Sequence, residues 1–374
     1  MPSVLLATGG YDHKLRLWEA SNGNCYQQLQ FGDSQVNCLE ISPSKKYIVA
    51  AGNPHTRLYD LAASDTNPLR ALEGHTHNVT AVGFQKDTKW MFSGSDDGTL
   101  RIWDLRSEGT ARDFGTCQRE YDNGGGINAV ALHPNQGELI AGDQNGNIRV
   151  FDLTQNKMSH EQQSNVGSPV RSISIAADAS LAATAHDNGV CVLWKLPTDS
   201  QTVSHFEERR IFQAHDTYVR RPRLCLVHVS AHDADLTPAP ALQALKCKLS
   251  PDLGYLATSS ADATVKLWNV GELLPDAAED SPGSGSDSAP QKQPPPRVEQ
   301  QPQASTVLKG HQRWVWDIAF SADSAYLVSA SSDQTAKLWD LEKGEDIRDY
   351  KGHTKAVTAV SLDDVPDPSP PARD

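Results

Sequence analysis

Short segments in which apolar and polar residues alternate recur along the chain, and each ends on an aromatic residue. Alternation with a period of two predicts β-strands, and the Asp, Asn and Gly residues between two such runs predict a tight turn. Seven strand–turn–strand units follow from this pattern: Leu6–Trp18, Val49–Tyr59, Phe92–Trp103, Ile140–Phe151, Ala183–Trp194, Ala257–Trp268 and Val328–Trp339.

The spacing of the closing aromatic residues predicts how the units are organised. Successive spacings are 41, 44, 48, 43, 74 and 71 residues. The first four are close to the roughly 40–45 residues that make one four-stranded propeller blade. We therefore predict an all-β chain, one seven-bladed β-propeller spanning residues 1–374, with insertions in the two long intervals.

A second element precedes some of the strand pairs, namely Gly74-His75, Ala214-His215, Gly310-His311 and Gly352-His353. With it the chain resembles the WD-repeat family, in which a His, a strand Ser or Thr, a turn Asp and a strand Trp form a buried hydrogen-bonded tetrad. The resemblance implies three tetrads in chain order: His75, Ser93, Asp97 and Trp103; His215, Thr258, Asp262 and Trp268; His311, Ser329, Asp333 and Trp339.

A fourth tetrad is divided between the two ends of the chain. Thr8, Asp12 and Trp18 have the right spacing but no His upstream, and His353 has no Trp downstream. We predict that the strand Val357–Leu362 pairs with the N-terminal strands and closes the ring, which removes free sheet edges. The other three units are degenerate and carry Asn53 with Tyr59, Asn145 with Phe151, and Asn188 with Trp194.

A His–Ser–Asp set also resembles a hydrolase triad. Here the set repeats around the ring between strands, so we expect these residues to stabilise the blades rather than to catalyse a reaction. No phosphate-binding loop, His-Glu-x-x-His or Gly-x-Ser-x-Gly motif is present. We expect no enzyme, no cofactor and no metal site.

The first insertion lies in the sixth blade. From the Gly-His histidine to the later Asp of the first strand there are 12 residues in two blades but 37 between His215 and Asp252, an excess of 37 − 12 = 25. Removing residues 220–244 restores the repeat, so the insertion is expected within the innermost strand, which Tyr218 and Val219 would begin. Two explanations remain open, a long loop and a translated intron.

The second insertion, residues 271–304, holds seven of the 22 prolines, with six acidic and two basic residues. Such a segment cannot bury enough apolar surface to order itself, so we predict a disordered loop. We also expect a flexible tail at residues 365–374.

Composition excludes several classes of function. The net charge of −13 argues against nucleic-acid binding and against docking on anionic lipid. No apolar run reaches the 18 residues of a transmembrane helix, the first residues lack a signal-peptide pattern, and the six cysteines form no Cys-x-x-Cys pair. We expect a cytoplasmic protein that reaches endomembranes only through a complex.

The narrow face of the propeller, around the channel, is the expected partner site. Where most blades place small or polar residues after the Gly-His pair, the seventh has Arg313-Trp314-Val315-Trp316. Trp and Arg are enriched at interface hot spots. We therefore predict that at least one of these two tryptophans contacts a partner; the alternative is that Trp316 packs into the ring centre.

Several runs carry a closer resemblance: Ala7–His13, Asp33–Asn37, Leu132–Gln144, Arg313–Trp316 and Gly352–Val357. Together they resemble the small WD-repeat subunits of target-of-rapamycin (TOR) kinase complexes, also called G-protein-beta-subunit-like proteins. The resemblance implies a noncatalytic, monomeric propeller within a larger complex. It would bind an insertion of the TOR kinase domain through Gln35, Asn37, Trp314 and Trp316, stabilise the kinase and support assembly with other subunits.

Alternatives from other classes also remain at this stage. Trp103-Asp104-Leu105-Arg106 resembles the box that engages the adaptor of a cullin-type ubiquitin ligase, which would make the chain a substrate receptor. An Arg after Trp-Asp-Leu is also common by chance in WD repeats. A generic scaffold with another partner and an enzyme are further alternatives.

Overall fold

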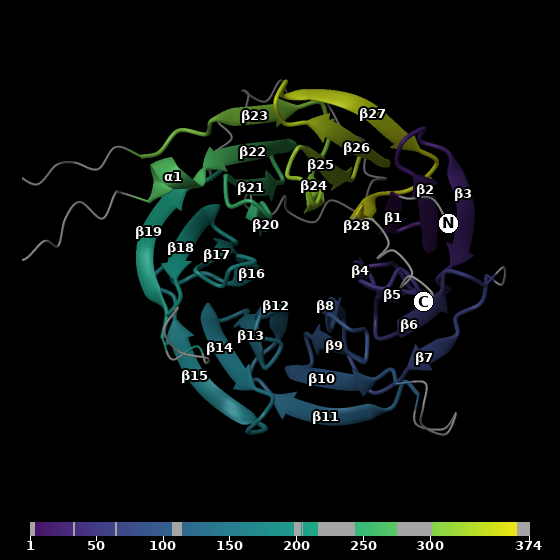
Figure 1. Ribbon diagram of the computed structural model, residues 1–374, viewed down its shortest axis with the longest axis horizontal. Helices are drawn as coiled ribbons and strands as arrows, with labels where there is room; N and C mark the ends of the chain where they lie inside the picture. The colour runs from purple at the N-terminus through teal and green to yellow at the C-terminus, as the bar shows by residue number, and fades with distance from the viewer. Residues whose placement is uncertain are drawn as a thin grey trace, which may run out of the picture.

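The computed structural model describes residues 4–32, 34–63, 66–106, 114–197, 203, 205–215, 244–274 and 301–364. Within them, seven four-stranded antiparallel sheets stand around a central channel (Figure 1). The seven-bladed propeller predicted from the sequence is thus confirmed. We number the blades along the chain, so that blade 1 contains β28, β1, β2 and β3, and blades 2 to 7 follow in chain order.

Each blade runs from an inner strand at the channel to an outer strand at the rim. The inner strands are β4 (Cys38–Ile41), β8 (Val79–Phe84), β12 (Ile127–Leu132), β16 (Val170–Ile175), β20 (Ala244–Leu249), β24 (Val315–Phe320) and β28 (Val357–Asp363). The second strands are β1 (Leu5–Gly10), β5 (Tyr47–Ala51), β9 (Trp90–Ser95), β13 (Glu138–Asp143), β17 (Leu181–His186), β21 (Tyr255–Ser260) and β25 (Tyr326–Ser331).

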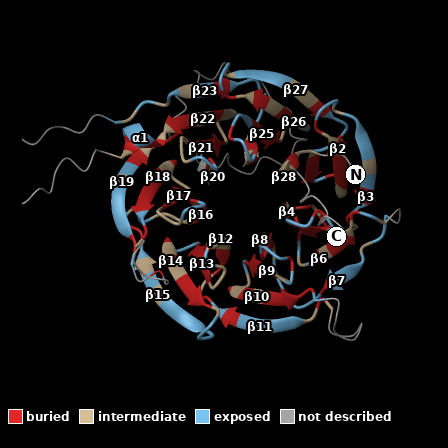
Figure 2. Cartoon of the chain, in the orientation of Figure 1, coloured by how far each residue is buried: buried red, intermediate tan, exposed pale blue. Residues whose placement is uncertain are grey.

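The third strands are β2 (Lys14–Glu19), β6 (Thr56–Asp60), β10 (Thr99–Asp104), β14 (Asn147–Asp152), β18 (Val190–Lys195), β22 (Thr264–Asn269) and β26 (Thr335–Asp340). The outer strands are β3 (Cys25–Gln30), β7 (Arg70–Leu72), β11 (Cys117–Asp122), β15 (Lys157–Gln163), β19 (Glu207–Gln213), β23 (Thr306–Lys309) and β27 (Glu345–Lys351). The outer strands are largely exposed, whereas the second and third strands are mostly buried (Figure 2).

The hydrophobic core lies in the seams between blades. Among the described residues, seven buried clusters each join two neighbouring blades. Leu17 of blade 1, for example, shares a cluster with Ile48 and Tyr59 of blade 2. Small residues on the second strands allow this packing: a Cβ added at Gly94 would lie 2.6 Å from Val130 Cγ2 of the next blade. The ring is therefore held together by contacts that each blade makes with both neighbours.

The ends of the chain close the ring within one sheet. β28 pairs antiparallel with β1, with Leu6 opposite Leu362 and Thr8 opposite Val360. This is the pairing predicted from the divided tetrad, and it leaves blade 1 as complete as the others.

The four tetrads that spacing predicted are each brought within hydrogen-bond distance. In blade 3, His75 Nδ1 lies 2.9 Å from Asp97 Oδ2 and His75 Nε2 lies 2.7 Å from Ser93 Oγ, which accepts from Trp103 Nε1 at 2.8 Å. The corresponding distances in the other three tetrads lie between 2.7 and 3.0 Å. These tetrads are His215, Thr258, Asp262 and Trp268; His311, Ser329, Asp333 and Trp339; and His353, Thr8, Asp12 and Trp18.

This chain of bonds fits a neutral imidazole, with Nδ1–H donating to the carboxylate and Nε2 accepting from the hydroxyl. Burial lowers the pKa of His75 and of His353, although their Asp partners act in the opposite direction. Burial alone would raise the pKa of Asp262, but hydrogen bonds from His215 and Thr264 outweigh it and lower this pKa to about 2.

Acid should therefore destabilise the fold. Below about pH 6.5 the unfolded chain takes up protons on histidines that stay neutral in the folded ring, and from about pH 4 downward the same holds for the tetrad carboxylates. We expect the urea midpoint to fall from pH 8 to pH 5 and to fall further toward pH 3, followed by tryptophan fluorescence. In a His353→Gln variant, the fall of the urea midpoint between pH 8 and pH 5 should be smaller. A midpoint of the parent chain at pH 5 that equals or exceeds its midpoint at pH 8 would contradict this account.

Blade 5, one of the three degenerate units, completes a similar chain with a histidine from its own second strand. His186 Nε2 lies 3.1 Å from Thr184 Oγ1, which accepts from Trp194 Nε1 at 3.0 Å, and His186 Nδ1 lies 3.0 Å from the carbonyl oxygen of Ser168. Spacing along the sequence did not reveal this arrangement, because the histidine comes from a different position of the blade.

The inner strand of blade 6 begins after the predicted insertion. β20 starts at Ala244, which pairs with Ser260 just as Val79 pairs with Ser95 in blade 3. β20 therefore begins at the last residue of the predicted insertion 220–244, and Ala244 takes the pairing position that the prediction gave to Val219. Residues 216–243, which include most of the predicted insertion 220–244, lie outside the described residues.

The two ends of the predicted loop 271–304 are ordered. The short helix α1 (Val270–Leu273) is capped by Asn269, whose Oδ1 accepts from Gly271 N at 2.9 Å, and Leu273 is buried. Ala304 packs against the same hydrophobic cluster. Residues 275–300 and the tail 365–374 lie outside the described residues. In the described part of the chain, no helix is long and apolar enough to cross a membrane.

Candidate functional site

We call the narrow face the side of the ring that carries the loops leading into the inner strands and the turns between second and third strands. Two depressions meet there at Trp316 and Tyr11. One is lined by Tyr11, Ala261, Asp262, Ala263, Gln312, Arg313, Trp314, Trp316, Ser332, Lys355 and Ala356. The other is the mouth of the channel, where Gln35 and Asn37 also lie. The structure thus brings the four residues proposed for partner binding into two adjoining depressions.

Trp314 and Trp316 form an aromatic pair at the start of β24. Val315 between them is fully buried, so the alternation of the strand places both tryptophans away from that seam. Their ring centroids are 5.4 Å apart at an interplanar angle of 54°. Trp316 Nε1 donates to Ser332 Oγ at 2.6 Å, and both side chains are half-buried. The hydrogen bond orients Trp316 while leaving part of its ring available to a partner.

Gln35 and Asn37 have a different setting. Both are half-buried at the channel mouth, and Asn37 Nδ2 donates to the carbonyl oxygen of Val79 in the next blade at 3.3 Å. Equivalent bonds join other blades: Thr80 Oγ1 donates to Ile127 O at 2.6 Å and Asn128 Nδ2 to Val170 O at 2.9 Å. Asn37 is therefore also a structural brace between blades.

This series of braces ends at blade 5, where Arg171 occupies the position and donates to Asp187 of its own blade. The same register position carries Leu245 in blade 6 and Trp316 in blade 7. Neither can donate to the neighbouring carbonyl as a hydroxyl or amide does, because Leu245 is apolar and Trp316 is bonded to Ser332 within its own blade. The apolar groups on the narrow face therefore gather where the polar braces end.

Three residues of this site were not predicted from the sequence. Tyr11 is 42% exposed and directly precedes Asp12 of its tetrad. At the same position, the other three tetrad blades carry Asp96, Ala261 and Ser332. Arg313 and Lys355 are exposed at the edge of the narrow-face depression that contains Trp314. Within the described residues neither has an ion-pair partner. The signal for Tyr11 was present, since it is the one aromatic residue at that turn position. We call Tyr11, Arg313, Trp314, Trp316 and Lys355 the aromatic patch.

The patch combines aromatic anchors with positive charge on an acidic chain. Large aromatic side chains in a depression supply most of the affinity in many interfaces, and rim charges steer association. Arg313 and Lys355, which have no ion-pair partner in the described part of this chain of net charge −13, favour a partner segment that is apolar with acidic neighbours.

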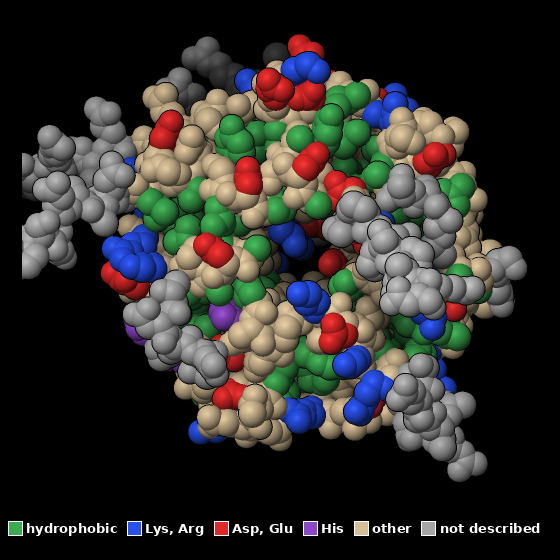
Figure 3. Space-filling model, in the orientation of Figure 1, with side chains coloured by type: hydrophobic (Ala, Val, Ile, Leu, Met, Phe, Trp, Pro, Cys, Tyr) green, Lys and Arg blue, Asp and Glu red, His purple; other side chains and the backbone are tan. Residues whose placement is uncertain are grey.

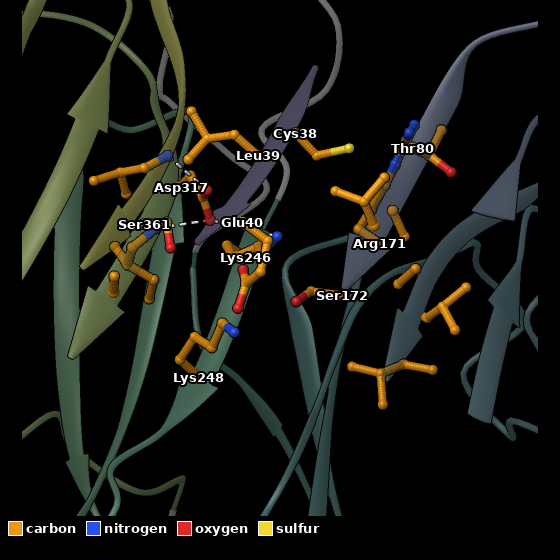
Figure 4. A pocket seen from close by; sticks show the side chains of 18 of the residues that line it. Cys38, Leu39, Glu40, Thr80, Arg171, Ser172, Lys246, Lys248, Asp317 and Ser361 are labelled. Carbon is orange, nitrogen blue, oxygen red and sulfur yellow. Dashed lines mark hydrogen bonds and ion pairs between the residues drawn. The ribbon is translucent and has the colours of Figure 1, made fainter. Parts of the chain in front are cut away.

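The channel below the mouth is lined by ionisable groups that largely compensate one another (Figure 4). Lys246 Nζ lies 3.4 Å from Asp317 Oδ1, and Asp317 Oδ2 accepts from the backbone N–H of Val360 at 3.0 Å. Burial raises the pKa of Glu40, which the positive charge of Lys248 partly offsets. Among the described residues, no group of His, Cys, Asp and Glu side chains is placed to hold a metal ion.

The His–Ser–Asp sets are not arranged for chemistry on a substrate. Ser93 is fully buried, its hydroxyl oxygen accepts from Trp103, and His75 is 6% exposed. A nucleophile must reach its substrate, whereas this hydroxyl is enclosed by its own blade.

The run Leu132–Gln144, part of the closer resemblance, includes a clamp between three blades. The buried carboxylate of Glu138 accepts from Asn135 Nδ2 at 2.9 Å and from the backbone N–H of Val203, in the segment between β18 and β19, at 3.0 Å. Gln136 Oε1 accepts from Lys86 N of blade 3 at 2.9 Å. Asn135, Gln136 and Glu138 of this run therefore make hydrogen bonds inside the ring.

Replacing Glu138 by alanine should lower the free energy of unfolding by about 1–3 kcal/mol, because it leaves the buried N–H of Val203 without an acceptor. Urea unfolding would measure the loss, and hydrogen exchange at the Val203 amide should become faster. Glu342→Ala, which changes an exposed turn residue, is the matched control. Equal unfolding of the two variants would show that the clamp does not stabilise the ring.

The comparisons with known proteins agree with this architecture. Five segments match the family described as WD domain, G-beta repeat: residues 23–60, 66–104, 115–152, 224–269 and 302–340. The class is therefore a WD-repeat propeller.

More particularly, the chain belongs to the LST8 family of target of rapamycin complex subunits. It is 43% identical over 269 residues to target of rapamycin complex subunit LST8-1 of Arabidopsis thaliana, covering 72% of this chain and 78% of that protein. It is 39% identical over 363 residues to target of rapamycin complex subunit LST8 of Saccharomyces cerevisiae, covering 97% of this chain and 100% of that protein.

A further relative, of Arabidopsis thaliana, is named as the non-functional target of rapamycin complex subunit LST8-2 and is 39% identical over 322 residues, covering 86% of this chain and 83% of that protein. Overall identity therefore does not separate the relatives named as complex subunits from the relative named as non-functional. The cullin-ligase alternative gains no support from these names. In the structure Arg106 Nε donates to Asp104 Oδ1 at 2.9 Å, an ion pair within its own blade.

Proposed function

We propose that this chain is the noncatalytic WD-repeat subunit of TOR complexes. It binds the TOR kinase domain with the aromatic patch, stabilises the kinase and supports assembly with the other subunits. Six of the relatives compared, at 37–43% identity, are named target of rapamycin complex subunit without further qualification, which supports membership. The half-buried pair Trp314 and Trp316 on the narrow face is the observation that supports the mode of binding.

A binding role follows from the chemistry of the patch. Ligands that bind only the folded form of a kinase stabilise it by mass action, without any reaction of their own. The patch offers apolar area and positive charge, and the four buried tetrads are occupied by their own hydrogen bonds. On this proposal the propeller is a monomer of 40.7 kDa when free, acts in the cytoplasm and reaches endomembranes through its complex.

Affinity purification of the tagged chain from its own cells, followed by mass spectrometry, tests the proposal. The expected result is a TOR kinase at near-equal amounts with the bait. A Trp314→Ala/Trp316→Ala bait should lose the kinase, while a Met158→Ala bait, changed on the exposed outer strand β15, should retain it. Recovery of a ligase adaptor and a cullin without the kinase would contradict the proposal.

A further inference from the structure

The opposite side of the ring, which we call the wide face, carries the turns between first and second strands and between third and fourth strands. Its charge is uneven. The turns between the first and second strands of blades 5, 6 and 7 carry the exposed carboxylates of Asp178, Asp252 and Asp323. Figure 3 shows Lys and Arg side chains gathered where β9, β10 and β11 lie, and acidic side chains more frequent over β21–β25.

Two adjoining depressions on the wide face share Lys89 and Arg106 and cross the seams of blades 2, 3 and 4. We call them together the wide-face groove. Its apolar surface comes mainly from half-buried Trp90 and half-buried Leu153, and Tyr47, which also lines it, is buried. Hydrogen bonds across both seams hold the groove in shape; Thr88 Oγ1, for example, donates to Ser44 Oγ at 3.1 Å.

Positive charge in the groove exceeds negative charge. Arg106 is paired with Asp104, and Lys89 Nζ lies 3.6 Å from Asp87 with both side chains more than half exposed. Neither Lys46 nor Arg119 has a carboxylate within ion-pair distance among the described residues, and the charge of Asp60 acts on Lys46 only from farther away. Lys46 Nζ lies 4.8 Å from the ring centroid of Tyr47, and Arg119 donates to the carbonyl oxygen of Leu153.

We propose that the wide-face groove binds an extended acidic peptide segment of a partner protein. Its carboxylates meet Lys46 and Arg119, and an apolar side chain between them packs on Trp90. Charge complementarity carries this assignment, because Lys46 and Arg119, neither of which has an ion-pair partner among the described residues, flank apolar surface on a chain whose net charge is −13.

A narrow ligand fits this charge pattern better than a broad one. A flat anionic membrane or a nucleic acid lying over the wide face would bring its charges against Asp178, Asp252 and Asp323. A peptide confined to blades 2 to 4 avoids them. The groove faces away from the aromatic patch, so both surfaces can be occupied together.

Fluorescence anisotropy with the full chain tests the inference. The probe is a fluorescein-labelled short peptide in which a Trp-Leu pair is flanked by glutamates. We expect saturable binding that weakens about tenfold or more in Lys46→Glu/Arg119→Glu. The matched control is Lys309→Glu/Lys343→Glu, which makes the same change in net charge on blades 6 and 7 and should bind like the parent chain.

Equal affinity of the two double variants would overturn the inference, as would equal binding of a peptide with glutamine in place of glutamate. Loss of peptide binding in Trp316→Ala would place the peptide on the narrow face and overturn it too. Binding of phosphatidylserine vesicles that Lys46→Glu/Arg119→Glu abolishes would assign the groove to lipid instead. Thermal melts identify any variant that has unfolded, and Lys46→Gln/Arg119→Gln then replaces it as a milder removal of charge.

Discussion

Replacing Trp316 by alanine is expected to weaken binding to the TOR kinase domain by about 30-fold to 1,000-fold, or about 2–4 kcal/mol. Trp316 lines both narrow-face depressions and lies against Trp314, with its indole oriented by Ser332. Its removal would take away an anchor without opening a seam of the core, since the ring is half-buried at the surface. Titration calorimetry with purified kinase domain would measure the change.

The same variant also tests the alternative that Trp316 is a core residue. We expect its melting temperature to stay close to that of the parent chain. Ser332→Ala should weaken binding by a smaller factor, because it releases the orientation of the ring but keeps the ring itself. A variant that melts early while the remaining folded protein binds with full affinity would show that Trp316 is packing and not an anchor.

Replacing Asp12 by alanine should lower the free energy of unfolding by about 3–5 kcal/mol. Asp12 Oδ2 accepts from Arg16 Nη1 at 2.8 Å and Asp12 Oδ1 lies 2.9 Å from His353 Nδ1, so one carboxylate joins the two ends of the chain. The side chain of Arg16 is 7% exposed and would be left buried without a counter-charge. Urea unfolding monitored by tryptophan fluorescence would measure the loss.

Two further variants make this prediction specific. Asp96→Ala changes an exposed carboxylate in the corresponding turn of blade 3 and should unfold like the parent chain. Asp12→Ala/Arg16→Met removes the stranded charge as well, and should recover part of the lost stability. If Asp12→Ala and Asp96→Ala unfold alike, the tetrad at the closure does not hold the ends of the chain together.

Most of the fold could be predicted because it consists of short units whose sequence pattern repeats. Each strand–turn–strand unit shows its own alternation and ends on an aromatic residue, so no knowledge of distant contacts is needed. The closure was predictable for the same reason, since Thr8, Asp12 and Trp18 lacked a histidine that only His353 could supply.

Features at the junctions that lead from one blade into the next were not predicted. The start of β20 at Ala244 is decided by pairing with Ser260, and the apolar alternation around the insertion fits Val219 equally well. The hydrogen bonds of His186 in blade 5 reach Ser168 in the loop before β16, a position that carries no Gly-His pair. Short motifs describe a blade well, but they do not describe its junctions.

The candidate site shows the same division. Trp314 and Trp316 differ so clearly from the polar residues of the other blades that the sequence alone singled them out. Tyr11 lies at the other end of the chain and joins the patch only because the ring closes between β28 and β1. Asn37 was predicted to face a partner, and the structure adds that its amide braces the next blade.

The most direct test of the proposed interface is photo-crosslinking from position 11 within the assembled complex. A chain carrying benzoylphenylalanine in place of Tyr11, 42% exposed beside Trp314 and Trp316, would be purified with its partners, irradiated and analysed by mass spectrometry. The account predicts a crosslink to the TOR kinase domain, and none from the same group at Met158 on β15. A kinase crosslink from Met158 together with none from position 11 would contradict it.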